Sequence, residues 1–377
     1  MSLTIVQASP HTHDARRVSM IMLIVIGCLA PAMLWGVYQF GWPALNVLVL
    51  SIASALIAEA LSLWIAGKPI KPFLLDGSAV LTACLLAMSL PPWTSWWVVV
   101  FGNAVAIIIG KQLFGGIGQN VFNPAMLARV VLLISFPLQM TTWVAPHPFF
   151  SANTPSFSEG LSITFNGIED IDSISSASIL GYVKTGFTQG HTVDESLASF
   201  NAGHASKLEN ASTTDLSTTE LLLGSIPGSM GETSALLLLL GGLVLLALRI
   251  ITWHIPVSML ASVAILSLIA HTLDPDHFLG PLYHLLSGGL ILGAFFIATD
   301  MVTSPCTARG QLIFGAGCGI LDFVIRSWGG FPEGIGFAVM LMNAATPLID
   351  HFVRPRIYGR GRDGKPIAIE NSADTAA

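Results

Sequence analysis

The sequence has few charged residues: Asp, Glu, Lys and Arg together make up 10% of its 377 positions, against about 25% in an ordinary soluble domain. Apolar residues make up 53%. A soluble chain could not keep that much apolar surface away from water, whereas a helix that spans a membrane needs about 20 mainly apolar residues. The shortage of charge therefore excludes an ordinary soluble globular protein and favours a polytopic membrane protein.

Cysteine and the common catalytic motifs are also scarce. The four cysteines form no CxxC pair, so we expect small buried apolar residues and no metal or iron–sulfur site built from this chain alone. There is no Walker loop, HExxH, GxSxG, or GxGxxG after a strand, which leaves a soluble nucleotide site or a hydrolase without support. We also expect no cleavable signal peptide and no nucleic-acid partner.

Ten apolar segments predict an all-α membrane protein with about ten transmembrane helices. Several of them are short and are interrupted by Gly or Pro, as in "LDGSAVLTACLLAMSLPP". The ten segments lie near 18–40, 44–66, 77–92, 96–113, 124–145, 234–252, 255–273, 283–302, 311–326 and 334–353.

The basic residues predict the orientation of these segments, because Lys and Arg gather on the cytoplasmic side of a membrane. If both termini are cytoplasmic, twelve basic residues fall on that side and only Lys184, Lys207 and Arg326 on the other. We therefore expect residues 147–232 to form a polar insert outside the cytoplasm. The expected units are a first membrane repeat, the insert, a second membrane repeat and a basic cytoplasmic tail, at 1–146, 147–232, 233–353 and 354–377.

A weak internal repeat relates the two membrane halves. When residues 76–90 are aligned with 287–301, four positions are identical: Gly77, Leu81, Ala83 and Ala87 match Gly288, Leu292, Ala294 and Ala298. Five spans in each half would give the halves opposite orientations, as in the inverted repeats of many transporters. The broken segments of the two halves are then expected to meet near the middle of the membrane.

Polar residues near these broken segments are candidates for an ion or polar pathway, since an ionisable residue at membrane depth is usually functional. The candidates are Asp76, Asp300, Asn120 and Asn123. Asp300 could instead cap the following turn. The loop at 110–127 could instead be a tight cytoplasmic turn with a snorkelling Lys111, and Pro124 is placed to begin a helix.

Three further patterns predict local structure. Ser229 and Glu232 have the spacing of a capping box before an apolar helix. Arg326 is expected to pair with Glu333 at the membrane edge. In the acidic, hydroxyl-rich stretch "IEDIDSISSASILGYVKTG" (168–186), Ser175 or Ser176 is expected to cap a helix whose body is "ILGYVK".

Five segments resemble, in order, the signature blocks of the RnfD/NqrB family of membrane flavin subunits. They are "LLDGSAVLTACLLAMSLPP", "GKQLFGGIGQNVFNPAM", "GSIPGSMGETSALL", "FFIATDMVTSPCTARGQ" and "WGGFPEGIGFAVMLMN". The compact length and the short N-terminal leader resemble RnfD more than NqrB.

The resemblance implies an FMN bound covalently through its phosphate. The attachment motif of the family is matched by Asp172, Ser175, Ser176 and Ala177, and its acceptor position is Ser178. The family usually has threonine at the acceptor position, whose hydroxyl forms the same phosphoester. Some relatives also bind a second, non-covalent flavin (riboflavin) in the membrane.

The resemblance also implies a role and partners. The chain would be the D subunit of a bacterial inner-membrane ferredoxin:NAD oxidoreductase of the Rnf type, which couples electron flow to Na⁺ or H⁺ translocation. Its expected partners are an NADH-binding flavoprotein, a ferredoxin-like iron–sulfur subunit, a second covalent-FMN subunit, small membrane subunits and a flavin transferase. The alternatives are the B subunit of the Na⁺-translocating NADH:quinone reductase and a urea-transporter-like channel without a redox role.

Overall fold

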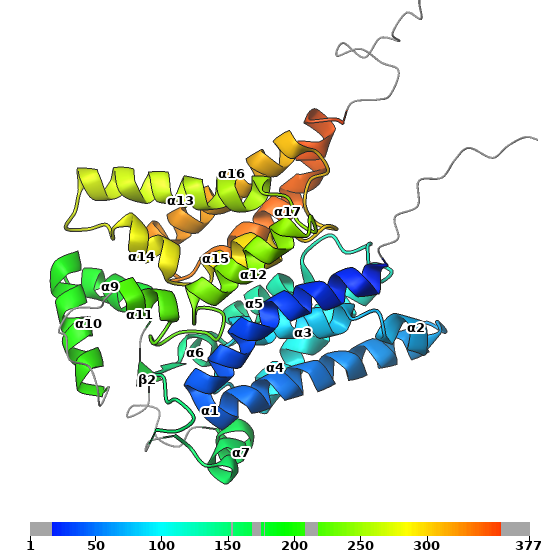
Figure 1. Ribbon diagram of the computed structural model, residues 1–377, viewed down its shortest axis with the longest axis horizontal. Helices are drawn as coiled ribbons and strands as arrows, with labels where there is room; N and C mark the ends of the chain where they lie inside the picture. The colour runs from blue at the N-terminus through cyan, green and yellow to red at the C-terminus, as the bar shows by residue number, and fades with distance from the viewer. Residues whose placement is uncertain (1–16, 152–153, 168–174, 177, 208–217, 356–377) are drawn as a thin grey trace, which may run out of the picture.

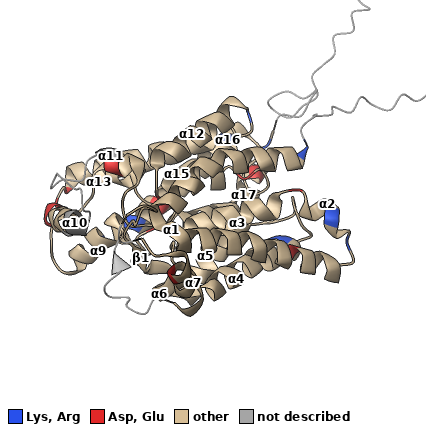
Figure 2. Ribbon diagram, turned by 60° about the horizontal axis from the view of Figure 1, so that its bottom comes forward, with Lys and Arg blue, Asp and Glu red and all other residues tan. Residues whose placement is uncertain are grey.

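The computed structural model describes residues 17–151, 154–167, 175–176, 178–207 and 218–355, and these residues are mostly helical (Figure 1). The start of the first helix and the end of the last lie at the same end of the bundle, and the helices of the polar insert lie at the opposite end (Figure 1). The prediction of a mostly helical chain is confirmed. Charged side chains are sparse along the long helices (Figure 2).

The first half is built around α1 (Val18–Ile65), which consists of two helical arms that meet at Gly41. Its first arm runs to that residue and the second runs back beside it (Figure 1). The elements that follow are α2 (Ile70–Leu74), α3 (Ser78–Ser89), α4 (Trp96–Ala104), the π-helix η1 (Val105–Gln112), α5 (Pro124–Ser135) and α6 (Pro137–Thr141).

The polar insert contains short helices and one strand, which pairs with a strand that lies just before the insert. Ser175 and Ser176 form β2, which pairs antiparallel with β1 (Trp143–Val144), so that Trp143 faces Ser176 and Val144 faces Ser175. The helices of the insert are α7 (Phe157–Asn166), α9 (Ile179–Thr188), α10 (Val193–Lys207) and α11 (Thr218–Leu223).

The second half returns to long apolar helices. Its elements are α12 (Ala235–Ala247), α13 (His254–Leu273), α14 (Pro281–Leu286), α15 (Leu290–Leu292), the π-helix η2 (Gly293–Ile297), α16 (Ala308–Trp328) and α17 (Ile335–Phe352). The short elements α3 and α15 follow Gly77 (φ 81°) and Gly288 (φ 70°), the two glycines that the predicted repeat aligns.

All ten predicted apolar segments contain helix. Among the described residues, four helices are long and apolar enough to cross a membrane by themselves: α1, α13, α16 and α17. Large apolar side chains on the outside of the bundle are exposed, including Trp64 at 70% and Leu34 at 68%. An outer surface of this kind is suited to lipid rather than to water.

Glycines allow two of these helices to pack closely. A Cβ added at Gly315 of α16 would lie 2.6 Å from Ile255 O of α13, and one added at Gly319 would lie 2.5 Å from Met259 O. The two glycines have the GxxxG spacing that lets helix backbones approach each other in membranes. Any larger residue at either position would push α13 and α16 apart.

Candidate functional site

Ser178, the predicted flavin acceptor, is the N-cap residue of α9. Its backbone is extended, and its Oγ accepts a hydrogen bond from the Gly181 N–H at 3.3 Å. The helix predicted at "ILGYVK" is therefore confirmed, but its cap is Ser178 rather than Ser175 or Ser176. Of the other motif residues, Ser175 and Ser176 form β2, while Asp172 and Ala177 lie outside the described residues.

The position of Ser178 suits a phosphate. Phosphate is stabilised at a helix N-terminus, because free backbone amides and the positive end of the helix dipole point at it. The ten residues of α9 supply such an end. A Cβ added at Gly181 would lie 3.8 Å from Pro332, so the first turn of α9 packs against the segment before α17. Ser178 is only 4% exposed, so this packing has to open before an enzyme can reach the hydroxyl.

Lys184 fixes α9 to the second half of the chain. Its Nζ donates hydrogen bonds to three backbone carbonyl oxygens, those of Ile325 at 3.2 Å, Arg326 at 3.0 Å and Phe331 at 3.0 Å. Burial lowers the pKa of the Lys184 amine. The Lys184 ammonium group, bound by these carbonyl oxygens, therefore fixes the position of α9 relative to the end of α16.

A cavity of about 330 Å³ runs along the same face of α9. It lies between α9, the segment 274–284 and the end of α16. Its lining combines aromatic and polar side chains, which include Phe187, His277, Phe278, Arg326 and Trp328.

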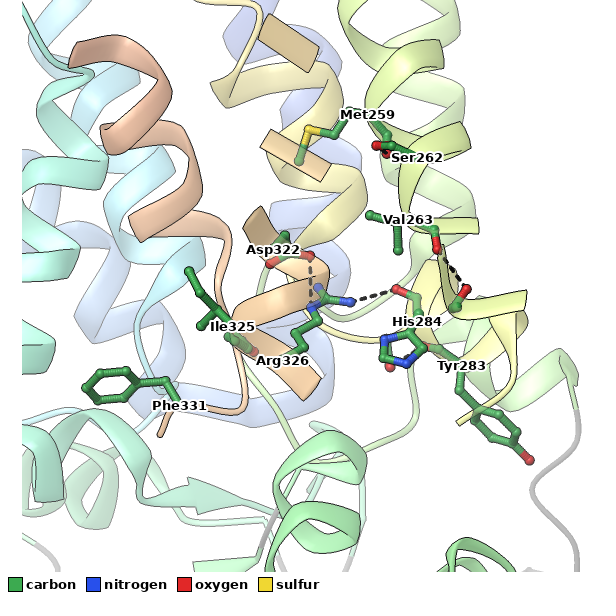
Figure 3. A network of polar contacts seen from close by, with 12 residues as sticks. Met259, Ser262, Val263, Tyr283, His284, Asp322, Ile325, Arg326 and Phe331 are labelled. Carbon is green, nitrogen blue, oxygen red and sulfur yellow. Dashed lines mark hydrogen bonds and ion pairs between the residues drawn. The ribbon is translucent and has the colours of Figure 1, made fainter. Parts of the chain in front are cut away.

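Arg326, which lines this cavity, is the centre of a buried polar network (Figure 3). Its Nε lies 2.9 Å from Asp322 Oδ2, one helical turn earlier on α16. Its Nη1 donates a hydrogen bond to the backbone oxygen of His284 at 2.7 Å (Figure 3). The guanidinium therefore ties α16 to α14.

The predicted pairing of Arg326 with Glu333 is wrong. Glu333, in the segment before α17, instead forms its ion pair with Arg129 of α5. The two side chains are 6% and 7% exposed. The pair joins the two halves of the chain.

The predicted capping box before α12 is also wrong in its detail. Ser229 does contact Glu232, but the N-cap of α12 is Ser234, whose Oγ accepts a hydrogen bond from the Leu237 N–H at 3.2 Å. Ser229 instead donates two hydrogen bonds to Glu232 Oε1. The Ser229–Glu232 contact therefore orients a buried carboxyl group rather than the start of a helix.

A second cavity lies between the two halves and brings three predicted polar residues together. Asn120, Asn123 and Asp300 all line it, with an apolar wall that includes Phe295 and Phe296. Asn123 caps α5, because its Oδ1 accepts hydrogen bonds from the Ala125 and Met126 N–H groups, and Pro124 begins that helix as predicted.

Asp300 also has a structural role in this cavity. It caps the turn after η2, since its Oδ1 accepts a hydrogen bond from the Val302 N–H at 3.2 Å. The capping role considered from the sequence is therefore confirmed. Whether Asp300 also belongs to an ion or polar pathway stays a prediction.

Asp76, the fourth predicted residue, lies beside this cavity. Its Oδ1 accepts a hydrogen bond from the Ser78 N–H at 2.7 Å, and Ser78 lines the cavity. Lys111 Nζ donates to Ser78 Oγ at 2.6 Å and forms a buried ion pair with Glu59. The snorkelling position considered for Lys111 is wrong, because the residue is only 3% exposed.

Sequence reasoning missed three buried ionisable residues: Glu59, Arg129 and Asp322. Glu59 and Arg129 are each the single charged residue of an otherwise apolar helix, whereas Asp322 shares α16 with its partner Arg326. That isolation is itself a signal, because such residues in membrane helices usually face the bundle interior and pair with one another. The partners of Glu59 and Arg129 could not be identified, since they come from distant segments.

The fold and these sites define a class: an integral membrane protein of apolar helices with buried ion pairs and polar cavities. Residues 5–359 match the model of the NQR2, RnfD, RnfE family. The chain belongs to this family.

Curated relatives cover nearly the whole chain. A protein of Stutzerimonas stutzeri is 54% identical over 93% of this chain and 94% of its own length. One of Halorhodospira halophila is 47% identical over 96% and 98%, and one of Rhodobacter capsulatus is 49% identical over 84% of each chain. All three are named as the D subunit of an ion-translocating oxidoreductase complex.

Proposed function

We propose that this chain is the D subunit of an ion-translocating oxidoreductase complex of the Rnf type. The observation that carries the proposal is the identity of 54% over 93% of the chain with a relative of that name. The chain contributes to a multi-subunit oxidoreductase and translocase, and its partners are the other subunits of the complex. Its proposed location is a bacterial inner membrane.

The proposed cofactor is an FMN joined through its phosphate to Ser178 Oγ. A bound flavin supplies electron transfer in steps of one or two electrons. The residues of this chain hold and orient it: the first turn of α9 stabilises the phosphate, and Lys184 fixes α9 against the end of α16. The proposed flavin site lies at the insert end of the bundle (Figure 1).

The arrangement of the helices supports the proposed topology. The start of α1 and the end of α17 lie at the end of the bundle opposite α9 and α10 (Figure 1). If the two termini are cytoplasmic, the insert at the opposite end of the bundle lies in the periplasm. The positive φ of both Gly77 and Gly288 supports two repeats with corresponding breaks. The cavity lined by Asn120, Asn123 and Asp300 is the proposed polar pathway for Na⁺ or H⁺.

Mass spectrometry and flavin fluorescence test the proposed cofactor. When the chain is expressed with a flavin transferase, a peptide covering residues 168–186 should gain the mass of FMN less water. Ser178→Ala should abolish flavin fluorescence in a denaturing gel, and Ser178→Thr should retain it. Thr185→Ala is the matched control and should also retain it.

The alternatives predict different results. A colourless protein made in the presence of the transferase would contradict the flavin site and favour a channel. If quinone, rather than ferredoxin, accelerates turnover of the flavin in the purified complex, the chain would be the B subunit of a quinone reductase instead.

A further inference from the structure

The helix α7 of the insert lies against the corner of α1 and has a buried inner face (Figure 1). A Cβ added at Gly160 would lie 2.8 Å from Trp42 Cβ, and Asn46 Nδ2 donates a hydrogen bond to Thr164 Oγ1 at 3.3 Å. These contacts hold one side of α7 to the start of the second arm of α1. The opposite side is polar and exposed, with Ser158, Ser162 and Asn166.

An apolar stripe runs along α7 between these two faces. It consists of Phe157, Leu161 and Phe165, whose spacing of four residues places them on one side of the helix. Phe157 is 53% exposed and Phe165 is 55% exposed, so the packing on α1 leaves more than half of each ring uncovered. A helix with a polar face beside an exposed apolar stripe is typical of segments that lie in the interface of a membrane.

The stripe continues onto the outer surface of the membrane helices. The ring of Phe157 lies 5.1 Å from that of Trp42, and the ring of Phe165 lies 6.3 Å from that of Trp96 at the start of α4. Phe101 lies five residues further along α4, which is about 7 Å deeper, and it is exposed as well. The apolar surface therefore passes without a break from a predicted membrane segment to α7.

This surface carries almost no charge. Segments 18–58 and 77–110 contain no Asp, Glu, Lys or Arg, and Glu159 is the only such residue between positions 130 and 167. Glu159 is already used locally, because its Oε2 accepts a hydrogen bond from the Ser156 N–H at 2.7 Å. Uncharged aromatic surfaces, rich in Trp and Tyr, are typical of the level where the acyl chains of a membrane meet the headgroups.

We propose that the apolar stripe of α7 contacts phospholipid, at the boundary between headgroups and acyl chains on the insert side of the membrane. Lipid fits this surface better than a protein partner does, because the stripe is continuous with Phe101 in a predicted membrane segment and offers no charge for a partner to match. The polar face of α7, with Ser158 and Ser162, then lies toward water.

Spin labels on the full chain in phosphatidylcholine nanodiscs test the proposal. The background variant replaces Cys28 and Cys306 with alanine, and it should take up no label because Cys84 and Cys318 are buried. Labels are then attached to Phe157→Cys and to Phe165→Cys. Oxygen dissolves in the acyl chains, whereas a nickel chelate stays in water, so the two reagents report which medium each label meets.

The matched controls are Ser158→Cys and Ser162→Cys, on the polar face of the same helix. The ratio of oxygen to nickel collisions should be severalfold higher at Phe157 and Phe165 than at these two positions. If the nickel chelate reaches all four labels equally, α7 lies in water and the proposal is wrong. If neither reagent reaches Phe157 and Phe165, protein covers the stripe, which also overturns the proposal.

A photo-crosslink in the intact complex, in its own membrane, separates lipid from a protein partner directly. With p-benzoylphenylalanine in place of Phe165, mass spectrometry should find phospholipid adducts, and the same group in place of Ser162 should give few. Adducts to a polypeptide, either a second copy of this chain or another subunit, would instead identify a protein interface. None of these results depends on whether Ser178 carries a flavin, so the flavin site and this lipid contact stand or fall separately.

Discussion

Removal of the Arg129 guanidinium should destabilise the fold strongly. The Arg129→Met substitution keeps most of the side-chain volume but leaves Glu333 buried without its cation. Breaking one partner of a buried ion pair costs about 3–5 kcal/mol. The side chains are 7% and 6% exposed, so solvent screening does not reduce that value much. We expect a loss of about 3 kcal/mol, because Glu333 can limit the cost by taking up a proton.

Reversible unfolding in mixed detergent micelles would measure this loss. In the double variant Arg129→Met with Glu333→Gln, no uncompensated charge remains, so about 2 kcal/mol should be recovered. Arg354→Met is the control: Arg354 is exposed at the end of α17 and should change stability by less than about 0.5 kcal/mol. A single variant that costs less than about 1 kcal/mol, or a double variant that costs the sum of both changes, would refute the reasoning.

Three further predictions concern packing, anchoring and pH. Gly241→Ala should destabilise the fold by about 1–3 kcal/mol, because the added Cβ would contact the backbone oxygen of Cys28. Gly27→Ala is the control and should not destabilise the fold, since nothing lies within 4 Å of its added Cβ. Equal melting temperatures for the two variants would contradict the close contact at Gly241. Lys184→Met should make α9 exchange its amide hydrogens faster than the wild type, since three hydrogen bonds to carbonyl oxygens are lost; unchanged exchange would show that Lys184 is not an anchor. A hydrogen bond from His277 to Asp274 and the charge of that carboxylate raise the pKa of His277 above its ordinary value of 6.5. Its contribution to stability should therefore be complete below pH 6.5 and be lost as pH rises through the raised pKa. Asp274→Asn should lower the pKa seen in an NMR titration, and an unchanged pKa would rule out the contact.

The long-range ion pairs could not be predicted from the sequence, although most helices could. Apolar runs of sufficient length determine helices wherever water is excluded, and local caps such as Asn123 and Asp300 act within three residues. Pairing is different, because it depends on which helix ends meet. Arg326 has a carboxylate one turn away on its own helix, and that local partner is preferred over Glu333.

The candidate site was predictable to a similar extent. Ser178 could be located from the attachment motif, and the helix that follows it from its apolar pattern. The hydrogen bonds by which Lys184 fixes this helix to the second half of the chain join residues that are 141–147 positions apart in the sequence. Contacts at such separations leave no periodic signal in a single chain.

The reversal of α1 at Gly41 has a consequence for how the protein can be probed. The chain changes direction through one residue with a positive φ of 72°, and Thr154 Cγ2 lies 3.1 Å from where its Cβ would be. Two antiparallel arms therefore share a corner that has no loop. A protease site or an epitope tag inserted at Gly41 would have to separate the two arms. The accessibility of this corner should therefore be mapped with single-residue labels in the neighbouring segment that contains Thr154.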